Sequence, residues 1–349
     1  MGFIDRLKRE GNAMQVVVLA GGVGSRLRPW TNQIPKPLLP MLDKTLLERV
    51  VEGIPADLVD EVVVAGGYKV DMIRQYFADS DVDFDVTIVP EDKPLGTGGA
   101  LANCSDVVSG TFACFNGDIV SSMDITPVLD LHKRNGGIGT LALWEVEDPT
   151  RFGIVGLDDN SRVTQFKEKP KKEEVFSNLI NAGSYILEDD IFEYMPEGKH
   201  SIERDVFPIL AAESKLNGIQ FSGYFIDAGT PESWSQGVQA CIRNKRFSSG
   251  EICGGSWFSH PMAKVIEGAR IVGSMIEGNV DIGDSEVVES TILSGSSVGE
   301  KSIISSCLIG RNATIGSNCN LSGVVVDHNS IIPSQTNQIG GKWPLVEQD

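Results

Sequence analysis

The stretch QVVVLAGGVGSRLRP, residues 15–29, decides the fold of the first part of this chain. Its first five residues form an unbroken β-branched and apolar run, which is typical of a strand buried on both faces of a parallel sheet. The chain then breaks into glycines. A glycine-rich turn at the carboxyl end of such a strand exposes backbone N–H groups where open α/β sheets bind ligands. Gly21 and Gly22 alone would also fit an ordinary tight turn.

Two cations accompany this turn. Arg26 follows the glycines, and Lys36 stands between two prolines in the run Pro35-Lys36-Pro37. Cationic side chains beside a cradle of backbone amides favour a polyphosphate ligand. The Rossmann fingerprint would need a third glycine where Leu27 stands, and the Gly-Lys-Ser/Thr of a P-loop is absent.

Strand and helix patterns alternate through the first two-thirds of the chain, which predicts a Rossmann-like, wound and mostly parallel sheet in an α/β domain. The expected strands are 61–65, 86–89, 111–115, 139–144, 163–168, 183–187 and 219–225. The expected helices are 46–51, 69–77, 99–104, 125–132, 202–213 and 232–243.

The residue pattern changes after Gly250, where single aliphatic residues recur every five or six positions among glycine and serine. This pattern predicts hexapeptide repeats in a left-handed parallel β-helix, with an irregular β-sandwich as the alternative. We expect three parts: an extension over 1–13, an α/β domain over 14–246 and a β-helix over 251–340. The flat faces of such a helix make a homo-oligomer a natural hypothesis.

A second glycine loop, PLGTGGA at residues 94–100, follows another strand and opens a helix. Gly96 and Gly98 would let the backbone approach a planar ligand, and the helix N-terminus would offer free N–H groups. A glycine turn that only caps the helix is the alternative.

Two aspartates end apolar strands. Asp118 closes Asn116-Gly117-Asp118, and Asp227 follows the run Tyr224-Phe225-Ile226. Mg²⁺ prefers carboxylate and phosphate oxygens, so both positions suit a metal held against phosphates. Either aspartate alone could instead cap a helix or a turn.

The blocks 19–29 and 35–40 resemble the signature of the sugar-nucleotide pyrophosphorylases, which join a sugar 1-phosphate to a nucleoside triphosphate. The resemblance implies a GT-A-like nucleotidyltransferase domain and Mg²⁺ as the cofactor, held by Asp118 and Asp227. One departure is Asp43-Lys44-Thr45, where that signature often has Lys-Pro; we expect a shifted loop and unchanged chemistry. The implied nucleotide-binding residues are Leu19, Ala20, Gly21, Gly22, Gly24, Ser25, Gly96, Thr97 and Gly98. The implied catalytic residues are Arg26, Lys36 and Lys169.

The resemblance also implies a sugar-phosphate site at Gly153, Glu168, Lys169 and Asn181. Lys169 would hold the phosphate, and Glu168 would accept hydrogen bonds from sugar hydroxyls. Asn181 carries an amide that can both donate and accept. A charged surface turn is the alternative for Glu168 and Lys169.

Within the family, the form Leu-Gly-Thr-Gly-Gly at 95–99 favours GTP, and the segment 201–208 looks like that of mannose-1-phosphate guanylyltransferases. Glucose-1-phosphate thymidylyl- or uridylyltransferase and a heptose phosphate guanylyltransferase are alternatives. A non-catalytic regulatory subunit with the same two-domain layout is an alternative of another class. We expect no second, acyl-CoA-dependent activity in the β-helix, because a single histidine, His328, is the one residue that would support it.

Composition sets further limits. A formal net charge of −18 over 349 residues argues against nucleic-acid and anionic-membrane partners. No run approaches a membrane span, and the start lacks the apolar core of a signal peptide. The six cysteines show no Cys-x-x-Cys spacing, so we expect free thiols and a cytoplasmic protein.

Overall fold

The computed structural model describes residues 13–80, 82 and 84–344, so the expected N-terminal extension lies almost wholly outside the described residues. The chain forms two compact units. The first contains the chain up to Gly22 together with Val50–Phe225, and the second contains Val23–Arg49 together with the chain from Ile226 onward. This division follows packing and sets the segment Val23–Arg49 apart from the strand that precedes it. The domain boundaries expected from the sequence stay a prediction.

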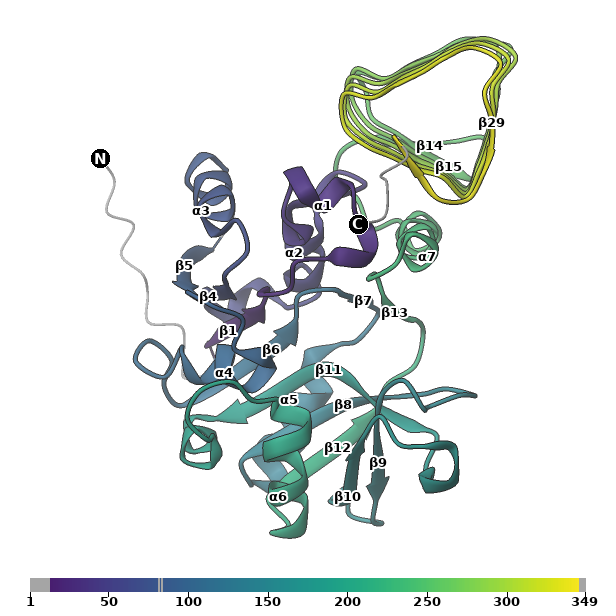
Figure 1. Ribbon diagram of the computed structural model, residues 1–349. Coiled ribbons are helices and arrows are strands. Elements are labelled where there is room, and N and C mark those ends of the chain that lie inside the picture. Colours follow the sequence, from purple (N-terminus) through teal and green to yellow (C-terminus); the bar gives the residue numbers. More distant parts are fainter. Residues whose placement is uncertain (1–12, 81, 83, 345–349) are drawn as a thin grey trace. The chain divides into compact units, whose positions relative to one another are not determined.

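The first unit is built on a nine-stranded sheet with the order β10-β9-β11-β6-β1-β4-β5, in which β8 pairs with β11 and β12 (Figure 1). Four strands at its centre and edge run parallel: β1 (Met14–Leu19), β4 (Val59–Gly66), β5 (Asp85–Pro90) and β6 (Thr111–Asn116). The other five strands of this sheet are β8 (Gly139–Glu145), β9 (Gly153–Leu157), β10 (Val163–Glu168), β11 (Leu179–Glu188) and β12 (Leu216–Gln220). The short strand β7 (Ile119–Ser121) is not part of it. The prediction of a wound, mostly parallel sheet is confirmed.

The helices of this unit are α3 (Val70–Asp79), α4 (Gly96–Ala102), α5 (Ile125–Asn135) and α6 (Phe207–Ala212). Short turns are η3 (Ala56–Leu58), η4 (Lys172–Glu174), η5 (Asp189–Tyr194) and the π-turn η6 (Ile202–Val206). The expected helix 202–213 is therefore two elements, because Pro208 lacks an N–H and begins a new helix at its first turn. The expected strand 219–225 is also wrong: β12 ends at Gln220, and β13 (Phe225–Asp227) follows.

The core of the first unit explains the apolar runs. Val16, Val17 and Val18 of β1 have no exposed surface, because parallel strands sandwiched between helices are buried on both faces. Each such side chain contributes about 1.5–3 kcal/mol by leaving water. This packing fixes the position of β1, and the glycines follow directly after the strand ends.

The second unit contains a parallel β-helix, whose coils stack with a triangular outline (Figure 1). One sheet holds β14 (Glu251–Cys253), β15 (Trp257–Ser259), β18 (Met275–Ile276), β21 (Thr291–Ile292), β24 (Leu308–Ile309), β27 (Val325–Val326) and β30 (Lys342–Trp343). The second holds β16 (Lys264–Val265), β19 (Asp281–Ile282), β22 (Ser297–Val298), β25 (Thr314–Ile315) and β28 (Ile331–Ile332). The third holds β17 (Arg270–Val272), β20 (Glu286–Val288), β23 (Ile303–Ser305), β26 (Asn320–Ser322) and β29 (Asn337–Ile339).

The repeat puts like residues in register from coil to coil. Ile282, Val298 and Ile315 are successive partners in one sheet and point inward. Buried small residues close the corners: the Ser290 N–H donates to Ser274 Oγ (3.0 Å), and the Cys307 N–H donates to Ser290 Oγ (3.0 Å). All six cysteines are free, as expected. The β-sandwich alternative is wrong.

The remaining elements of the second unit precede the β-helix. They are η1 (Ser25–Leu27), α1 (Trp30–Gln33), η2 (Lys36–Leu38), β2 (Pro40–Met41), β3 (Lys44–Thr45) and α7 (Pro231–Arg243), with α2 (Leu46–Val51) at the unit boundary. The helix expected over 232–243 is confirmed and begins with Thr230 as its N-cap.

Candidate active site

The glycine turn, residues 20–22, leaves the sheet between the ends of two neighbouring strands. The Ala20 N–H donates to the Ala65 carbonyl at the end of β4 (2.7 Å). The Leu19 carbonyl accepts from the Gly117 N–H after β6 (3.0 Å). Gly22 is exposed, and a Cβ added there would meet nothing within 4 Å. The turn therefore lies at the carboxyl edge of the sheet with open space beside Gly22, as a ligand cradle requires.

Glu91 is a residue of this edge that sequence reasoning missed. Its Oε2 accepts from the Leu95 N–H (3.0 Å), and its Oε1 is buried without a hydrogen-bond partner in the described structure. The carboxylate lies against Gly21, where a Cβ would clash with Oε1. Gly21 therefore leaves room for a side chain of the protein itself. The one signal in the sequence was the place of Glu91 directly after β5.

The second glycine loop, residues 94–100, packs against the segment that precedes η6. The Gly98 and Gly99 N–H groups donate to the His200 carbonyl (3.1 and 3.3 Å). A Cβ on Gly96 would clash with that carbonyl, and one on Gly98 would clash with the His200 ring. The expectation of free N–H groups at this helix N-terminus is therefore wrong for Gly98 and Gly99. The glycines make room for the chain itself.

Glu203 connects the same two segments. Its side chain is 8% exposed, and Oε2 accepts from Thr97 Oγ1 (2.6 Å) and from Ser201 Oγ (2.6 Å). Ser201 also caps η6, because its side chain accepts from the Arg204 N–H. The segment 201–208 thus holds the N-terminus of α4 in place, and the Thr97 hydroxyl donates its hydrogen to that contact.

Asp118 lies at the carboxyl end of β6, two residues after Asn116, the parallel partner of Leu19. Gly117 permits this approach, because a Cβ there would stand 2.8 Å from the Leu19 carbonyl. Asp118 is half-buried. The structure therefore places Asp118 beside the base of the glycine turn, at the edge where the sequence predicted it.

Gly153, Glu168 and Lys169 come together where β9 and β10 pair. Glu168 is the antiparallel partner of Gly153, and a Cβ on Gly153 would lie 2.9 Å from Glu168 Oε2. The Lys169 Nζ lies 3.3 Å from Glu168 Oε1, and the Lys169 side chain is 56% exposed. Burial raises the pKa of Glu168, and the nearby Glu203 carboxylate raises it further. An exposed cation beside a half-buried carboxylate can receive a phosphate and a hydroxyl.

Asn181 sits deeper than its expected role suggests. It is 8% exposed, its Nδ2 donates to the Tyr185 hydroxyl (2.9 Å), and its Oδ1 accepts from the Gly183 N–H (3.0 Å). Each end of the amide keeps capacity for one further hydrogen bond. These contacts shape the irregularity in β11 between Asn181 and Tyr185.

Arg26 and Asp227 meet in the second unit. Both lie against Gly229, where an added Cβ would clash with the Arg26 guanidinium and stand 2.7 Å from Asp227 Oδ1. Gly24 has a left-handed backbone (φ 63°) and caps η1, the turn that contains Ser25 and Arg26. A Cβ on Gly24 would stand 3.2 Å from the Cβ of Lys36, which is 7% exposed. The two predicted cations thus belong to one packed segment.

No group of three or more His, Cys, Asp and Glu residues suited to a metal occurs in the described part of the chain. Mg²⁺ is commonly held by one or two carboxylates together with substrate phosphates and water, so a carboxylate at the end of a strand, such as Asp118, suits a substrate-dependent Mg²⁺ site. A cavity of about 410 Å³ lies elsewhere, at the amino ends of β1 and β6, lined in part by Met14 and Thr111.

Comparison with known proteins identifies the family. The model described as nucleotidyl transferase matches residues 15–243, and the model described as GlmU-like, C-terminal hexapeptide matches residues 261–343. The chain belongs to the nucleotidyl transferase family. The left-handed β-helix and the sugar-1-phosphate nucleotidyltransferase activity predicted from the sequence are confirmed at the level of this family. Its members use a divalent metal ion.

Three relatives show how far the similarity extends. Mannose-1-phosphate guanylyltransferase of Mycobacterium tuberculosis is 35% identical over 288 residues, 80% of this chain and 79% of the relative. Mannose-1-phosphate guanylyltransferase 1 of Arabidopsis thaliana is 30% identical over 330 residues, 87% of this chain and 88% of the relative. The solved structure of HddC from Yersinia pseudotuberculosis with GMP-PN is 30% identical, with a TM-score of 0.52, and covers 64% of this chain and 98% of its own.

Within the described residues, the helices are all too short or too polar to cross a membrane.

Proposed function

We propose that this enzyme joins mannose 1-phosphate to GTP, giving GDP-mannose and pyrophosphate. The observation that carries the proposal is the 35% identity to a relative named mannose-1-phosphate guanylyltransferase over four-fifths of this chain. HddC, whose solved structure carries GMP-PN, adds support for a guanine nucleotide. The Leu-Gly-Thr-Gly-Gly form of residues 95–99 points to the same base.

The chemistry needs positioning and charge neutralisation more than a base. A sugar phosphate carries about −1.5 to −2 near neutral pH and is already a nucleophile. Two unit charges ~4 Å apart repel by roughly 4 kcal/mol at an effective dielectric constant of 20. In the reaction, a phosphate oxygen of the sugar attacks the α-phosphorus in line. The bond from that phosphorus to the bridging oxygen breaks, and pyrophosphate leaves with its electron pair.

Six residues would bind and orient the two anionic substrates. Lys169 would orient the attacking phosphate, while Glu168 would accept from the sugar hydroxyls. Arg26, with Lys36, would stabilise the charge that builds on the α-phosphorus and on pyrophosphate. Asp118 and Asp227 would hold Mg²⁺, which would supply positive charge to the phosphate oxygens.

A substrate matrix tests the proposal. Pyrophosphate release is measured with GTP, ATP, TTP and UTP, each combined with mannose, glucose and heptose 1-phosphates and Mg²⁺. We expect the highest kcat/KM for GTP with mannose 1-phosphate. A higher value for TTP or UTP with glucose 1-phosphate would replace the assignment within the family. Release with none of the pairs would overturn the proposal and favour a regulatory subunit.

We also propose a homo-oligomer in the cytoplasm, formed through a face of the β-helix. The strands of its three sheets leave flat outer faces, on which Ile303 and Ile331 are exposed. Size-exclusion chromatography with light scattering at micromolar concentration tests this, and a monomer would contradict it.

A further inference from the structure

The segment Val23–Arg49, here called the signature segment, carries Arg26 and Lys36 and belongs to the same compact unit as the β-helix. Its packing partners include residues of the β-helix, of α7 and of the chain between them. The proposed reaction itself involves no residue of the β-helix.

Trp30 anchors the segment to the last coils of the β-helix. Its side chain has no exposed surface, and its Nε1 donates to the Val326 carbonyl (2.9 Å). The indole stacks on the His328 ring, with 6.1 Å between centroids and 25° between planes. Its edge meets Trp234 of α7 at 6.4 Å and 83°. A buried aromatic cluster of this kind fixes α1 against the coil.

The hydrogen bonds of His328 define its protonation state. Nδ1 lies 2.8 Å from the Arg311 backbone nitrogen. A backbone N–H can only donate, so Nδ1 is the acceptor and the ring proton is on Nε2. Nε2 then donates to the Trp30 carbonyl (3.3 Å). Beside it, Gln33 Nε2 donates to Asp327 Oδ1 (3.2 Å). A neutral His328 thus completes both of its hydrogen bonds only with Trp30 in place.

Contacts lead from Trp30 to the predicted catalytic cation. Thr31, the next residue, donates from Oγ1 to the Gly24 carbonyl (2.9 Å). Gly24 caps η1, which carries Arg26, and packs beside the Cβ of Lys36. The position of α1 therefore sets the position of both cations.

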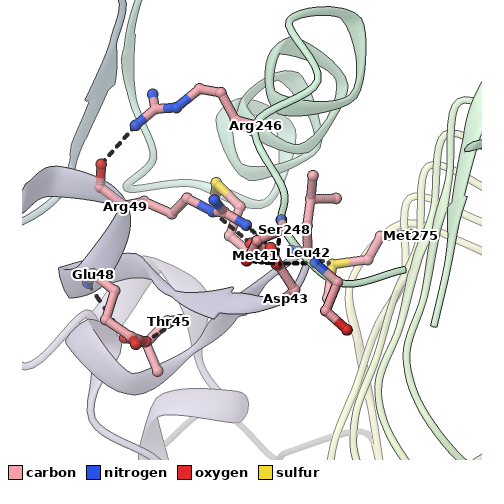
Figure 2. Close-up of polar contacts among 10 residues, drawn as sticks. Met41, Leu42, Asp43, Thr45, Glu48, Arg49, Arg246, Ser248 and Met275 are labelled. Atoms are coloured by element: carbon pink, nitrogen blue, oxygen red, sulfur yellow. Dashed lines mark hydrogen bonds and ion pairs between the residues drawn. The ribbon is translucent and has the colours of Figure 1, made fainter. Parts of the chain in front are cut away.

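Asp43 forms a second anchor at the other end of the segment (Figure 2). Its Oδ2 accepts from the backbone N–H groups of Ser248 (2.7 Å) and Ser249 (2.9 Å), and its Oδ1 pairs with Arg49. Nearby, the Leu42 N–H approaches Met275 Sδ (3.2 Å). Although burial opposes ionisation, these hydrogen bonds and Arg49 lower the pKa of Asp43. Asp43 belongs to the run that departs from the family signature, and here it ties the segment to the start of the β-helix.

We infer that the β-helix is a positioning element for catalysis, in which Trp30 and His328 hold the signature segment so that Arg26 and Lys36 reach their working positions. The inference rests on the proposed function for the roles of these two cations. Trp30 and His328 act through the segment and are positioning residues.

The geometry predicts a dependence on pH. Protonation would place a hydrogen on Nδ1 against the Arg311 N–H and break that hydrogen bond. Burial lowers the pKa of His328, the Trp30 carbonyl and Asp327 act in the opposite direction, and Arg311 adds to the lowering. The neutral ring is thus favoured in the native state. Its stabilising effect is complete above the ordinary histidine pKa of about 6.5 and is lost as the pH falls through the lower native value.

Full-length variants test the inference. His328→Phe keeps a ring for stacking and removes both hydrogen bonds, while His328→Asn keeps an acceptor for the Arg311 N–H. His260→Phe is the matched control, since His260 Nδ1 also accepts a backbone N–H, from Met262 (3.1 Å), within the first coil. At pH 8 we expect kcat/KM to fall ~10- to 100-fold in His328→Phe, less in His328→Asn, and not in His260→Phe.

Two readouts separate positioning from general damage. Hydrogen–deuterium exchange in peptides from residues 23–49 should rise in His328→Phe, while exchange in the strands of the central coils stays unchanged. The loss of activity of the wild type below about pH 6.5 should be steeper than in His328→Asn, which has no titrating ring. Should His328→Phe fail to fold, His328→Asn and the wild-type pH profile decide.

Unchanged exchange in 23–49 together with kcat/KM within twofold of the control would overturn the inference. If the wild type turns over none of the substrate pairs, the proposed function fails, and the exchange measurement still decides whether the coil holds the segment.

Discussion

The two glycine-rich loops of the first unit look alike in sequence and differ in what fills the space that their glycines leave. Beside Gly22 there is open space, whereas the His200 carbonyl and ring occupy the space beside Gly96 and Gly98. A missing side chain can make room for a ligand or for another part of the chain, and the sequence does not distinguish the two. We expect the glycine turn to be the phosphate cradle and the second loop to act mainly as a packed support, while nucleotide binding at Gly96, Thr97 and Gly98 stays a prediction.

The largest expected effect is the loss of kcat when charged residues near the glycine turn are removed. Asp118→Ala and Arg26→Ala should each lower kcat by at least ~10²–10³, the usual cost of one stabilising group in the transition state. The melting temperature should change little, because Asp118 is half-buried and Arg26 is exposed. Steady-state pyrophosphate release and thermal unfolding measure the two effects.

Two neighbours serve as controls for these variants. Arg28 is exposed two positions after Arg26, so Arg28→Ala should keep kcat. Asp124 caps α5 by accepting from the Thr126 N–H (2.9 Å), so Asp124→Ala should lose ~1 kcal/mol of stability and keep kcat. Near-normal turnover of Asp118→Ala or Arg26→Ala would remove that residue from the reaction.

A pair of glycine variants tests the comparison of the two loops directly. Gly98→Ala places a methyl group against the His200 ring and within 2.9 Å of the Ile202 nitrogen, and should cost roughly 1–3 kcal/mol of stability. Gly22→Ala meets nothing and should unfold like the wild type, while the KM for the nucleotide rises about tenfold. Urea denaturation and kinetics on both proteins give the answer. A stable Gly98→Ala with impaired nucleotide binding would reverse the assignment of the two loops.

The sequence predicted what depends on local pattern and missed what depends on contact between distant segments. The apolar run before Gly21 and the aliphatic repeat after Gly250 each predict an element by themselves, so the wound sheet and the β-helix could be derived. Glu91 and His200 carry no pattern of their own, and their contacts with Gly21 and Gly98 arise only after folding. The break of 202–213 into η6 and α6, by contrast, has a local cause in Pro208, which begins the second helix.

Within the candidate site, the placement of Glu168 and Lys169 was predictable, because Glu168 ends the expected strand 163–168 and Lys169 follows it; Gly153 begins the strand that pairs with it. The hydrogen bond of Thr97 was not predictable, since its hydroxyl donates to Glu203, more than a hundred residues away in the sequence. Trp30, between Arg26 and Lys36, shows no pattern of its own in the sequence, and its contacts with Val326 and His328 arise only in the folded chain.

A smaller effect is expected at Glu168. Glu168→Gln keeps the shape of the side chain and removes the charge, so the KM for the sugar phosphate should rise about 10-fold, the cost of one charged hydrogen bond. Burial raises the native pKa of Glu168, so its ionisation costs stability as the pH rises through that value. Glu168→Gln should therefore melt above the wild type at pH 7.5, and the difference should shrink toward pH 4. Glu174→Gln, at an exposed ion pair with Lys167 (2.8 Å), is the control and should leave KM unchanged.

The smallest effect in kinetics, and the finest test of the comparison, is expected at Thr97. Thr97→Val keeps the shape of the side chain, leaves Glu203 without one of its donors and removes the acceptor of the Ile202 N–H, so stability should fall by about 1–3 kcal/mol. Thr111→Val is the matched control, because Thr111 Oγ1 likewise donates to a glutamate, Glu188 (2.8 Å), at the amino end of β6. If the second loop only supports the site, both variants lose stability in urea, and both keep the KM for the nucleotide within about threefold. A KM that rises tenfold in Thr97→Val alone would mean that this hydroxyl leaves Glu203 to bind the nucleotide, and the second loop would then be a ligand cradle as well.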